Sequence, residues 1–288
     1  MINEEWIMSS SPTSPRIEVL PIEKIHPHEE YDPQILLEIT NSIRVEGLVH
    51  DPLLVEADNL MILDGTHRYW ALTRLGCPSV PVALYDYRSE DVKIGCWYRC
   101  VDREPDFDIS NFIRARATSK EEGLAAVRTR AAQFSIVYKD RSYTLASKFN
   151  IFDAYRFLSV LECGLSGRGH KLSYATESDA LEKLNSGEIG AILAPPPIMK
   201  EEAIQAAITG RLFPKKSTRH IISSRPMGLD IPLGWLREGV SSANIRLREM
   251  LAGGVFKKLS GGSVIDGRRY EEEVYIFELR TFGGGFQQ

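Results

Sequence analysis

Short apolar runs and helical patterns alternate along the chain, and their order predicts two successive mixed units. In the first unit, strands are expected at residues 16–25 (with a turn), 52–56, 60–63, 80–85 and 91–98. A helix begins after Asp32, a favourable N-cap, with Pro33 in its first turn, and ends at Gly47. A second helix covers residues 66–76, and the unit ends near residue 102.

The second unit repeats an alternation of strands and helices. After a polar, helix-prone connector, residues 134–138 and 142–145 form a hairpin, and the pattern continues as helix 152–165, strand 172–176, helix 178–186, strand 189–193 and helix 200–210. A donor-rich loop, 212–220, follows. The predicted fold class is α+β, with a flexible tail at 1–15, domains at 16–102 and 103–225, and a C-terminal extension at 226–288 to which the sequence assigns no role. Within the extension we expect a helix at 241–251, a hairpin around 261–267 and a frayed tail at 283–285.

Composition narrows the class of protein. The chain has 288 residues, of which 43% are hydrophobic and 26% charged, as in globular proteins. No apolar run reaches the ~20 residues of a membrane span, and the N-terminus lacks a signal-peptide pattern, so we expect a cytoplasmic protein without membrane contact. The four cysteines lack zinc-site spacing and are expected to be free thiols. A net charge of −4 argues against a dedicated nucleic-acid-binding protein.

The most informative segment is Asp64-Gly65-Thr66-His67-Arg68, which connects a buried strand to a helix. His67 and Arg68 stand in the first helical turn, where the helix dipole is already positive. Two cationic side chains are unfavourable at the positive end of a helix unless an anion binds there. The backbone N–H groups and both side chains can then face a phosphate. Asp64, at the end of the strand, is a candidate Mg²⁺ ligand beside phosphates, and its alternative role is the N-cap of the helix.

Two further clusters can carry chemistry. In the loop His28-Glu29-Glu30, a carboxylate could accept a proton from a substrate hydroxyl; the alternative is a solvated loop charge, and the residue types alone do not separate the two adjacent glutamates. The run 215–220 consists of polar donor side chains without a matching acidic run, which suits a carboxylate or phosphate, although a basic surface loop has the same composition.

The spacing Asp-Gly-X-His-Arg-X-X-Ala-X-X-X-X-Gly, from Asp64 to Gly76, resembles the nucleotide-binding box of the ParB/sulfiredoxin superfamily. With Pro27-His28-Glu29, Asp91-Val92-Lys93, Trp97-Tyr98 and Ser217-Thr218-Arg219-His220 in the same order, the chain resembles the free-serine kinases of that superfamily over about residues 16–225. The resemblance implies an N-terminal ParB/sulfiredoxin-like nucleotide-binding domain, a second α/β domain and an active-site cleft between them. One departure is Thr66, where the common box has His or another residue.

The resemblance also implies a reaction, which is phosphoryl transfer from ATP or ADP, with Mg²⁺, to the hydroxyl of free L-serine. Glu29 matches the catalytic base of the family, and Asp64 through Arg68 match the box for the nucleotide phosphates and Mg²⁺. Matches near the amino-acid site are Ser42, Trp97, Thr218, Arg219 and His220. The product, O-phospho-L-serine, serves amino-acid metabolism and also natural-product building blocks such as those of siderophores.

Three other readings compete with this one. A sulfiredoxin-like reductase needs a cysteine inside the box, where Thr66 stands. A ParB-type DNA-binding protein needs a downstream helix-turn-helix and a basic face, whereas the chain continues as mixed α/β with an acidic net charge. A nucleotide-binding regulator without kinase activity stays open, because intact motifs do not prove turnover. The sequence also leaves open the choice of ATP or ADP, the choice among serine, threonine, homoserine or an analogue, and the oligomeric state.

Overall fold

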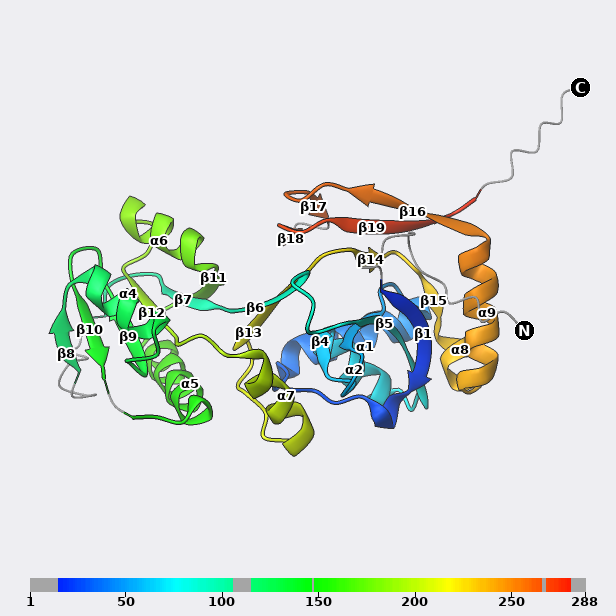
Figure 1. Ribbon diagram of the computed structural model, residues 1–288, viewed down its shortest axis with the longest axis horizontal. Helices are drawn as coiled ribbons and strands as arrows, with labels where there is room; N and C mark the ends of the chain where they lie inside the picture. Colours follow the sequence, from blue (N-terminus) through cyan, green and yellow to red (C-terminus); the bar gives the residue numbers. More distant parts are fainter. Residues whose placement is uncertain (1–14, 106–114, 147, 266–267, 281–288) are drawn as a thin grey trace, which may run out of the picture. The chain divides into compact units, whose positions relative to one another are not determined.

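The computed structural model describes residues 15–105, 115–146, 148–265 and 268–280 (Figure 1). Its contacts divide the chain into two compact units. Unit 1 contains Met1–Lys93, Ala207–Gly210 and His220–Gln288, and unit 2 contains Ile94–Ala206 and Arg211–Arg219. The domain limits expected at residues 102 and 225 stay predictions. The expected tails at 1–15 and 283–285 fall almost wholly outside the described residues.

Unit 1 is built on a four-stranded sheet in the order β1-β5-β3-β4 (Figure 1). These strands are β1 (Arg16–Pro21), β5 (Ser79–Tyr85), β3 (Leu53–Glu56) and β4 (Ile62–Asp64). β5 is buried along its whole length and pairs antiparallel with β1 and parallel with β3, while β4 pairs antiparallel with β3. The strands expected from the apolar runs are therefore confirmed, and β4 ends at the aspartate of the box.

Two helices of unit 1 pack against each other, α1 (Pro33–Glu46) and α2 (Thr66–Arg74); a single 3-10 turn, η1 (Ile22–Lys24), follows β1. The predicted ends of α1 are confirmed, because the Asp32 carboxylate accepts from the first backbone N–H groups and Gly47 closes the helix with a φ of +69°. α2 ends two residues before Gly76, the residue expected to close it.

The C-terminal part of unit 1 adds a second small sheet, in the order β14-β19-β16. The elements of this C-terminal part, in chain order, are β14 (Arg225–Met227), β15 (Ile231–Pro232), α8 (Leu233–Arg237), α9 (Val240–Ala252), β16 (Gly254–Leu259), β17 (Val264–Ile265), β18 (Arg268–Arg269) and β19 (Val274–Leu279). β15 pairs with β2 (Leu48–Val49). The Asn244 amide bonds the N–H and the C=O of Val19, both at 2.8 Å. This helix residue thereby covers the open edge of β1.

Unit 2 is a six-stranded antiparallel sheet in the order β11-β7-β12-β9-β10-β8. The strands are β7 (Tyr98–Val101), β8 (Arg116–Thr118), β9 (Phe134–Val137), β10 (Ser142–Leu145), β11 (Leu172–Ala175) and β12 (Ala191–Ala194). The helices α4 (Lys120–Arg128) and α6 (Glu177–Ser186) pack into one core of the sheet, and α5 (Ile151–Gly167) packs into the other. α7 (Lys200–Thr209) follows β12. The second α/β sandwich expected from the alternation of elements is confirmed.

Two details differ from the expectation. The segment 91–98 is not one strand: β6 (Val92–Cys96) and β7 are separated at Trp97. The donor-rich segment expected to be a loop up to His220 ends as strand β13 (Thr218–Ile222), which pairs with β6. Buried and partly exposed positions alternate along β13, with Thr218, His220 and Ile222 buried, and this period of two is typical of a strand.

The predicted free thiols are confirmed for all four cysteines. In the described part of the chain, no helix has both the length and the apolar character that crossing a bilayer would require.

Candidate active site

The box forms a tight turn between β4 and α2. Gly65 is the N-cap of α2 and has a φ of +104°, a conformation that L side chains rarely adopt. A Cβ at this position would lie 2.6 Å from Leu53 Cδ2 and 3.0 Å from Arg68 Nη2. α2 has no side-chain cap, so its first backbone N–H groups are not bonded by the N-cap residue. The turn therefore presents helix amides beside Arg68, as an anion site requires.

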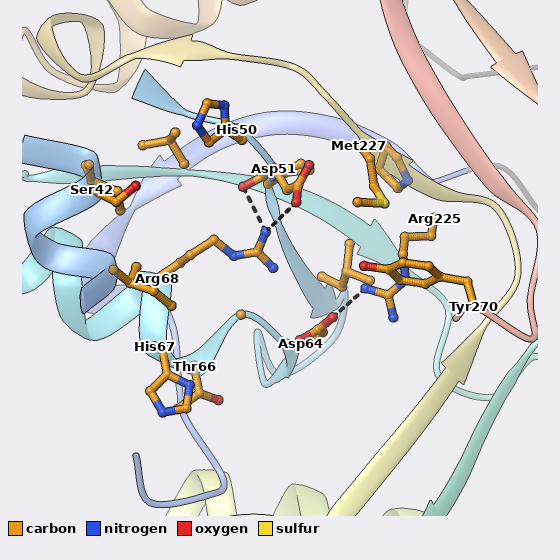
Figure 2. Close-up of a pocket in the computed structure, with 17 residues that line it drawn as sticks. Ser42, His50, Asp51, Asp64, Thr66, His67, Arg68, Arg225, Met227 and Tyr270 are labelled. Atoms are coloured by element: carbon orange, nitrogen blue, oxygen red, sulfur yellow. Dashed lines mark hydrogen bonds and ion pairs between the residues drawn. The ribbon is translucent and has the colours of Figure 1, made fainter. Parts of the chain in front are cut away.

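A cavity of about 360 Å³ opens in front of this turn (Figure 2). This volume lies within the range of small-molecule sites. The residues that line it come from α1, from the segment around β2 and β3, from the box, and from the C-terminal part of unit 1: Ile39, Ser42, Ile43, Val49, His50, Asp51, Pro52, Leu54, Asp64, Gly65, Thr66, His67, Arg68, Arg225, Pro226, Met227 and Tyr270. The structure thus brings the five predicted box residues and Ser42 to one cavity.

Asp64 is joined to a buried arginine. Arg225 Nη1 donates to Asp64 Oδ2, and Arg225 Nε and Nη2 each lie 3.2 Å from Glu272 Oε1. The side chains of Arg225 and Glu272 are 5% and 7% exposed. Burial alone would lower the pKa of Arg225, but the charges of Asp64 and Glu272 raise it, so the guanidinium stays charged.

The second arginine of the cavity is held by Asp51. Arg68 Nη1 lies 3.3 Å from Asp51 Oδ2, and Asp51 Oδ1 accepts from the Gly228 N–H at 2.9 Å. Figure 2 shows Arg68 and Arg225 entering the pocket from opposite sides, each facing an aspartate. The positive charge on this wall is therefore already matched by carboxylates.

His67 is tied to the start of α1. Its Nε2 accepts the backbone N–H of Asp32 at 2.9 Å. A ring nitrogen that accepts carries no proton, so His67 is a neutral imidazole in this arrangement rather than the cation that the sequence suggests. Its predicted place at the phosphates stays a prediction, now with a neutral ring.

The loop that carries Glu29 is fastened to β4, the strand of the box. The His26 N–H donates to Leu60 O and the Ile62 N–H to His26 O, both at 2.9 Å. Glu29 Oε1 lies 3.9 Å from His28 Nε2, and the Glu29 side chain is 14% exposed. The two anchoring bonds hold the candidate base in the same unit as the box.

His28 and His220 pack edge to face beside this loop, with ring centroids 5.3 Å apart. Burial lowers the pKa of His28 to about 4, so its imidazole is neutral at pH 7. His220 Nδ1 donates to Leu63 O at 3.0 Å, and its Nε2 lies 2.8 Å from the Tyr87 hydroxyl. His220 therefore contacts the residue that precedes Asp64.

The other predicted substrate residues belong to unit 2. The Trp97 ring lies 5.3 Å from the Arg219 guanidinium carbon and 5.7 Å from Lys216 Nζ, both within cation–π range. Arg99, fully buried and paired with Glu162 at 2.6 Å, donates to Trp97 O at 2.6 Å. Thr218 is buried in β13. Two cations gather on one indole, an arrangement suited to an anionic ligand.

At the other end of the cavity, Ser42 belongs to a charged cluster. Its hydroxyl donates to Glu46 Oε1, and His50 Nε2 and Nδ1 lie 2.6 Å from Glu46 Oε2 and Asp230 Oδ1. An imidazole that donates from both nitrogens is protonated. The hydrogen bond to Asp230 raises the pKa of His50, burial opposes it, and the hydrogen bond to Glu46 adds to the rise.

We expect His50 to titrate above its ordinary pKa of about 6.5 in a histidine NMR pH titration. The pKa of His50 is higher in the folded state than in the unfolded state. The contacts of protonated His50 with Asp230 and Glu46 therefore stabilise the fold at pH values below the unfolded-state pKa, and this contribution disappears as the pH rises through the folded-state pKa. Asp230→Asn, which suits the positive φ of this position, should lower the pKa of His50. An unchanged titration in that variant would contradict the assigned pairing.

Gly65→Ala is expected to weaken nucleotide binding at least about 10-fold, because both the strained backbone and the contact with Leu53 and Arg68 displace the turn. Gly76→Ala is the matched control, with a φ of +68° but open space around the added Cβ. Isothermal titration with ATP and thermal melts compare the two. Equal losses in both variants would show that the close approach at Gly65 has no role.

Sequence reasoning missed Arg225, Asp51 and Tyr270 in the cavity. Asp51 lies between β2 and β3, Arg225 begins the three-residue strand β14, and Tyr270 lies within the extension that received no role. No local spacing connects them to the box.

Comparisons with known proteins agree with this fold. The ParB N-terminal domain model matches residues 8–94. The chain is 30% identical over 202 residues to a ParB-like protein of Sulfolobus acidocaldarius, covering 69% of this chain and 86% of the relative. It is 25% identical over 235 residues to an ATP-dependent L-serine kinase of Staphylothermus marinus, covering 76% and 90%.

Among solved structures, a mutant free serine kinase in complex with ADP matches with a TM-score of 0.67 and 21% identity, over 81% of this chain and 98% of the other. The predicted α+β fold, with a ParB-like N-terminal domain followed by a second α/β part, is thereby confirmed. The chain belongs to the ParB-like protein family, and the relatives that it resembles over most of its length include L-serine kinases.

Proposed function

We propose that this protein is a kinase that transfers a phosphoryl group from ATP or ADP to the hydroxyl of free L-serine, giving O-phospho-L-serine. The observation that carries the proposal is the cavity in unit 1, where the Gly65 turn, Asp64 and Arg68 face one space while the Glu29 loop is bonded to the same strand β4. The similarity to an ATP-dependent L-serine kinase over three quarters of the chain supports it.

The nucleotide phosphates are assigned to the N-terminus of α2. Its amide groups, which no side chain caps, and the Arg68 guanidinium are donors that suit a polyphosphate. Thr66 also lines this cavity, and its hydroxyl is a further hydrogen-bond donor at the start of α2. Phosphoryl transfer depends mainly on alignment and on stabilising charge, and a rigid turn supplies the alignment.

The charges of the cavity favour a nucleotide that arrives with a divalent cation. Arg68 and Arg225 already face Asp51, Asp64 and Glu272, so the wall does not neutralise a polyphosphate by itself. No group of three potential ligand side chains stands among the described residues. Mg²⁺ is commonly held by one or two carboxylates together with substrate phosphates, so Asp64 fits as its protein ligand. Mg²⁺ bound there would neutralise charge on the phosphate oxygens.

Glu29 is assigned as the base that accepts or orients the proton of the serine hydroxyl. Its side chain is 14% exposed, and the neutral ring of His28 lies beside it. A base of this kind contributes about 10²–10⁴-fold. Arg219, with Thr218 and Trp97, is assigned to the charged end of the amino acid, while Ser42 and His220 stay candidates for the same substrate.

The test is a reaction matrix. The full chain with Mg²⁺ is mixed with ATP or ADP and with L-serine, L-threonine or L-homoserine, and phosphorylated amino acid is read by mass spectrometry. We expect phosphoserine with at least one of the two donors, and none when EDTA removes the metal. A different phosphorylated acceptor would keep the mechanism and change the substrate. Nucleotide binding without any product would instead favour a regulator.

A further inference from the structure

Within unit 1, the segment after β14 is bonded to the N-terminal part of the unit at two places. The Asn244 side chain bonds both backbone groups of Val19, and the Ser79 hydroxyl donates to Leu236 O at 2.9 Å. Its strand β19 runs parallel to β14, with Arg225 opposite Val274. These contacts join the C-terminal segment to the strand that carries the buried arginine of the cavity.

Within this segment, Tyr270 occupies a defined place on the cavity wall (Figure 2). Its backbone is held on both sides, since Gly262 N–H donates to Tyr270 O at 2.7 Å and Tyr270 N–H donates to Ser263 O at 2.9 Å. The residue is 7% exposed and packs in a small core with Met227 and Val274. A ring held in this way needs little further ordering when a ligand binds.

The ring also lies close to the charged centre of the pocket. Its centroid is 5.5 Å from the Arg225 guanidinium carbon, and Arg225 donates to Asp64. Two residues beyond Tyr270, Glu272 holds the other edge of the same guanidinium. The C-terminal segment therefore supplies the cavity with an aromatic face and with a carboxylate that orients Arg225.

We propose that Tyr270 contacts the nucleoside part of the bound nucleotide, so that the C-terminal segment is a working part of the nucleotide pocket. The inference rests on the proposed function. The phosphates have charged and amide donors at Gly65 and Arg68, whereas the tyrosine ring offers an apolar face. Met227 and Leu54 line the same cavity, so this apolar surface suits a base or ribose, because aromatic rings stack on every kind of nucleobase.

The test compares ATP with inorganic tripolyphosphate, both with Mg²⁺, by isothermal titration of the full chain. Tyr270→Ala is expected to weaken ATP binding at least ~10-fold and to change tripolyphosphate binding less than about 2-fold, since only ATP carries a nucleoside. Tyr270→Phe keeps the ring and should bind ATP within about 3-fold of the original protein. Tyr275→Ala, on β19 and outside the cavity lining, is the matched control and should bind both ligands as the original does.

Tyr270→Leu covers the case in which the alanine variant fails to fold, because leucine keeps the packing on Met227 and Val274 while it removes the ring. A folded Tyr270→Leu or Tyr270→Ala protein that binds ATP normally overturns the inference. Equal losses for ATP and tripolyphosphate also overturn it. If the original protein binds neither ligand, the proposed function fails first, and that result is distinct from a failure confined to the Tyr270 variants.

Discussion

Glu29→Gln is expected to keep nucleotide binding and to lower O-phospho-L-serine formation at least about 100-fold, the low end of general-base effects. Glutamine has nearly the same shape but cannot accept a proton from the serine hydroxyl. The loop should stay in place, because its anchors to β4 are backbone bonds through His26. The measurement is the initial rate of phosphoserine formation, with nucleotide affinity measured on the same preparation.

Glu30→Gln is the matched control, since it makes the same chemical change one residue along the loop. We expect its rate to stay within a few-fold of the original. If Glu30→Gln suffers the larger loss, the base is Glu30. An undiminished rate in Glu29→Gln would remove the catalytic role assigned to that residue.

Arg225→Met is expected to destabilise the fold by about 3–5 kcal/mol, because it leaves two carboxylates without their shared cation. Glu272 is 7% exposed and Asp64 31% exposed, so neither is fully solvated. Denaturant unfolding at pH 7 measures the loss. Adding Glu272→Gln to the same chain should recover part of it, since one of the unpaired carboxylates is then neutral.

Arg88→Met is the control for removing an arginine that pairs at the surface. Arg88 and Asp58 lie 3.0 Å apart with side chains 86% and 61% exposed, so the expected loss is below about 1 kcal/mol. If Arg225→Met lowers the free energy of unfolding no more than this control does, the buried pairing with Asp64 and Glu272 does not stabilise the fold. Such a result would also weaken the case for Asp64 as an oriented metal ligand.

Much of the fold could be predicted because local signals agree with tertiary structure. Asp32, Pro33 and Gly47 mark the ends of α1 by capping chemistry, which needs only neighbouring residues. The break at Trp97 and the strand at Thr218 were missed. β6 and β13 pair across more than a hundred residues, and no local pattern states which strand will be the partner.

The residues of the candidate site likewise fall into those that local sequence could predict and those that only the tertiary structure reveals. Asp64 through Arg68 are contiguous, so their spacing predicted a strand, a turn and a helix that share a cavity. Arg225 lies in β14 and Tyr270 precedes β19, the strand paired with β14, so both are far from the box in sequence. The protonation of His67 could not be predicted either, because it depends on a backbone N–H of a distant residue, Asp32.

The most direct test of the account follows nucleotide and phosphoserine together in one reaction. The full chain, Mg²⁺ and L-serine are incubated with ATP and, separately, with ADP, and consumed nucleotide and O-phospho-L-serine are quantified over time by mass spectrometry. For at least one donor, we expect one phosphoserine for each nucleotide consumed, and no comparable consumption when serine is omitted. Nucleotide that binds or hydrolyses with either donor while phosphoserine never forms would contradict it.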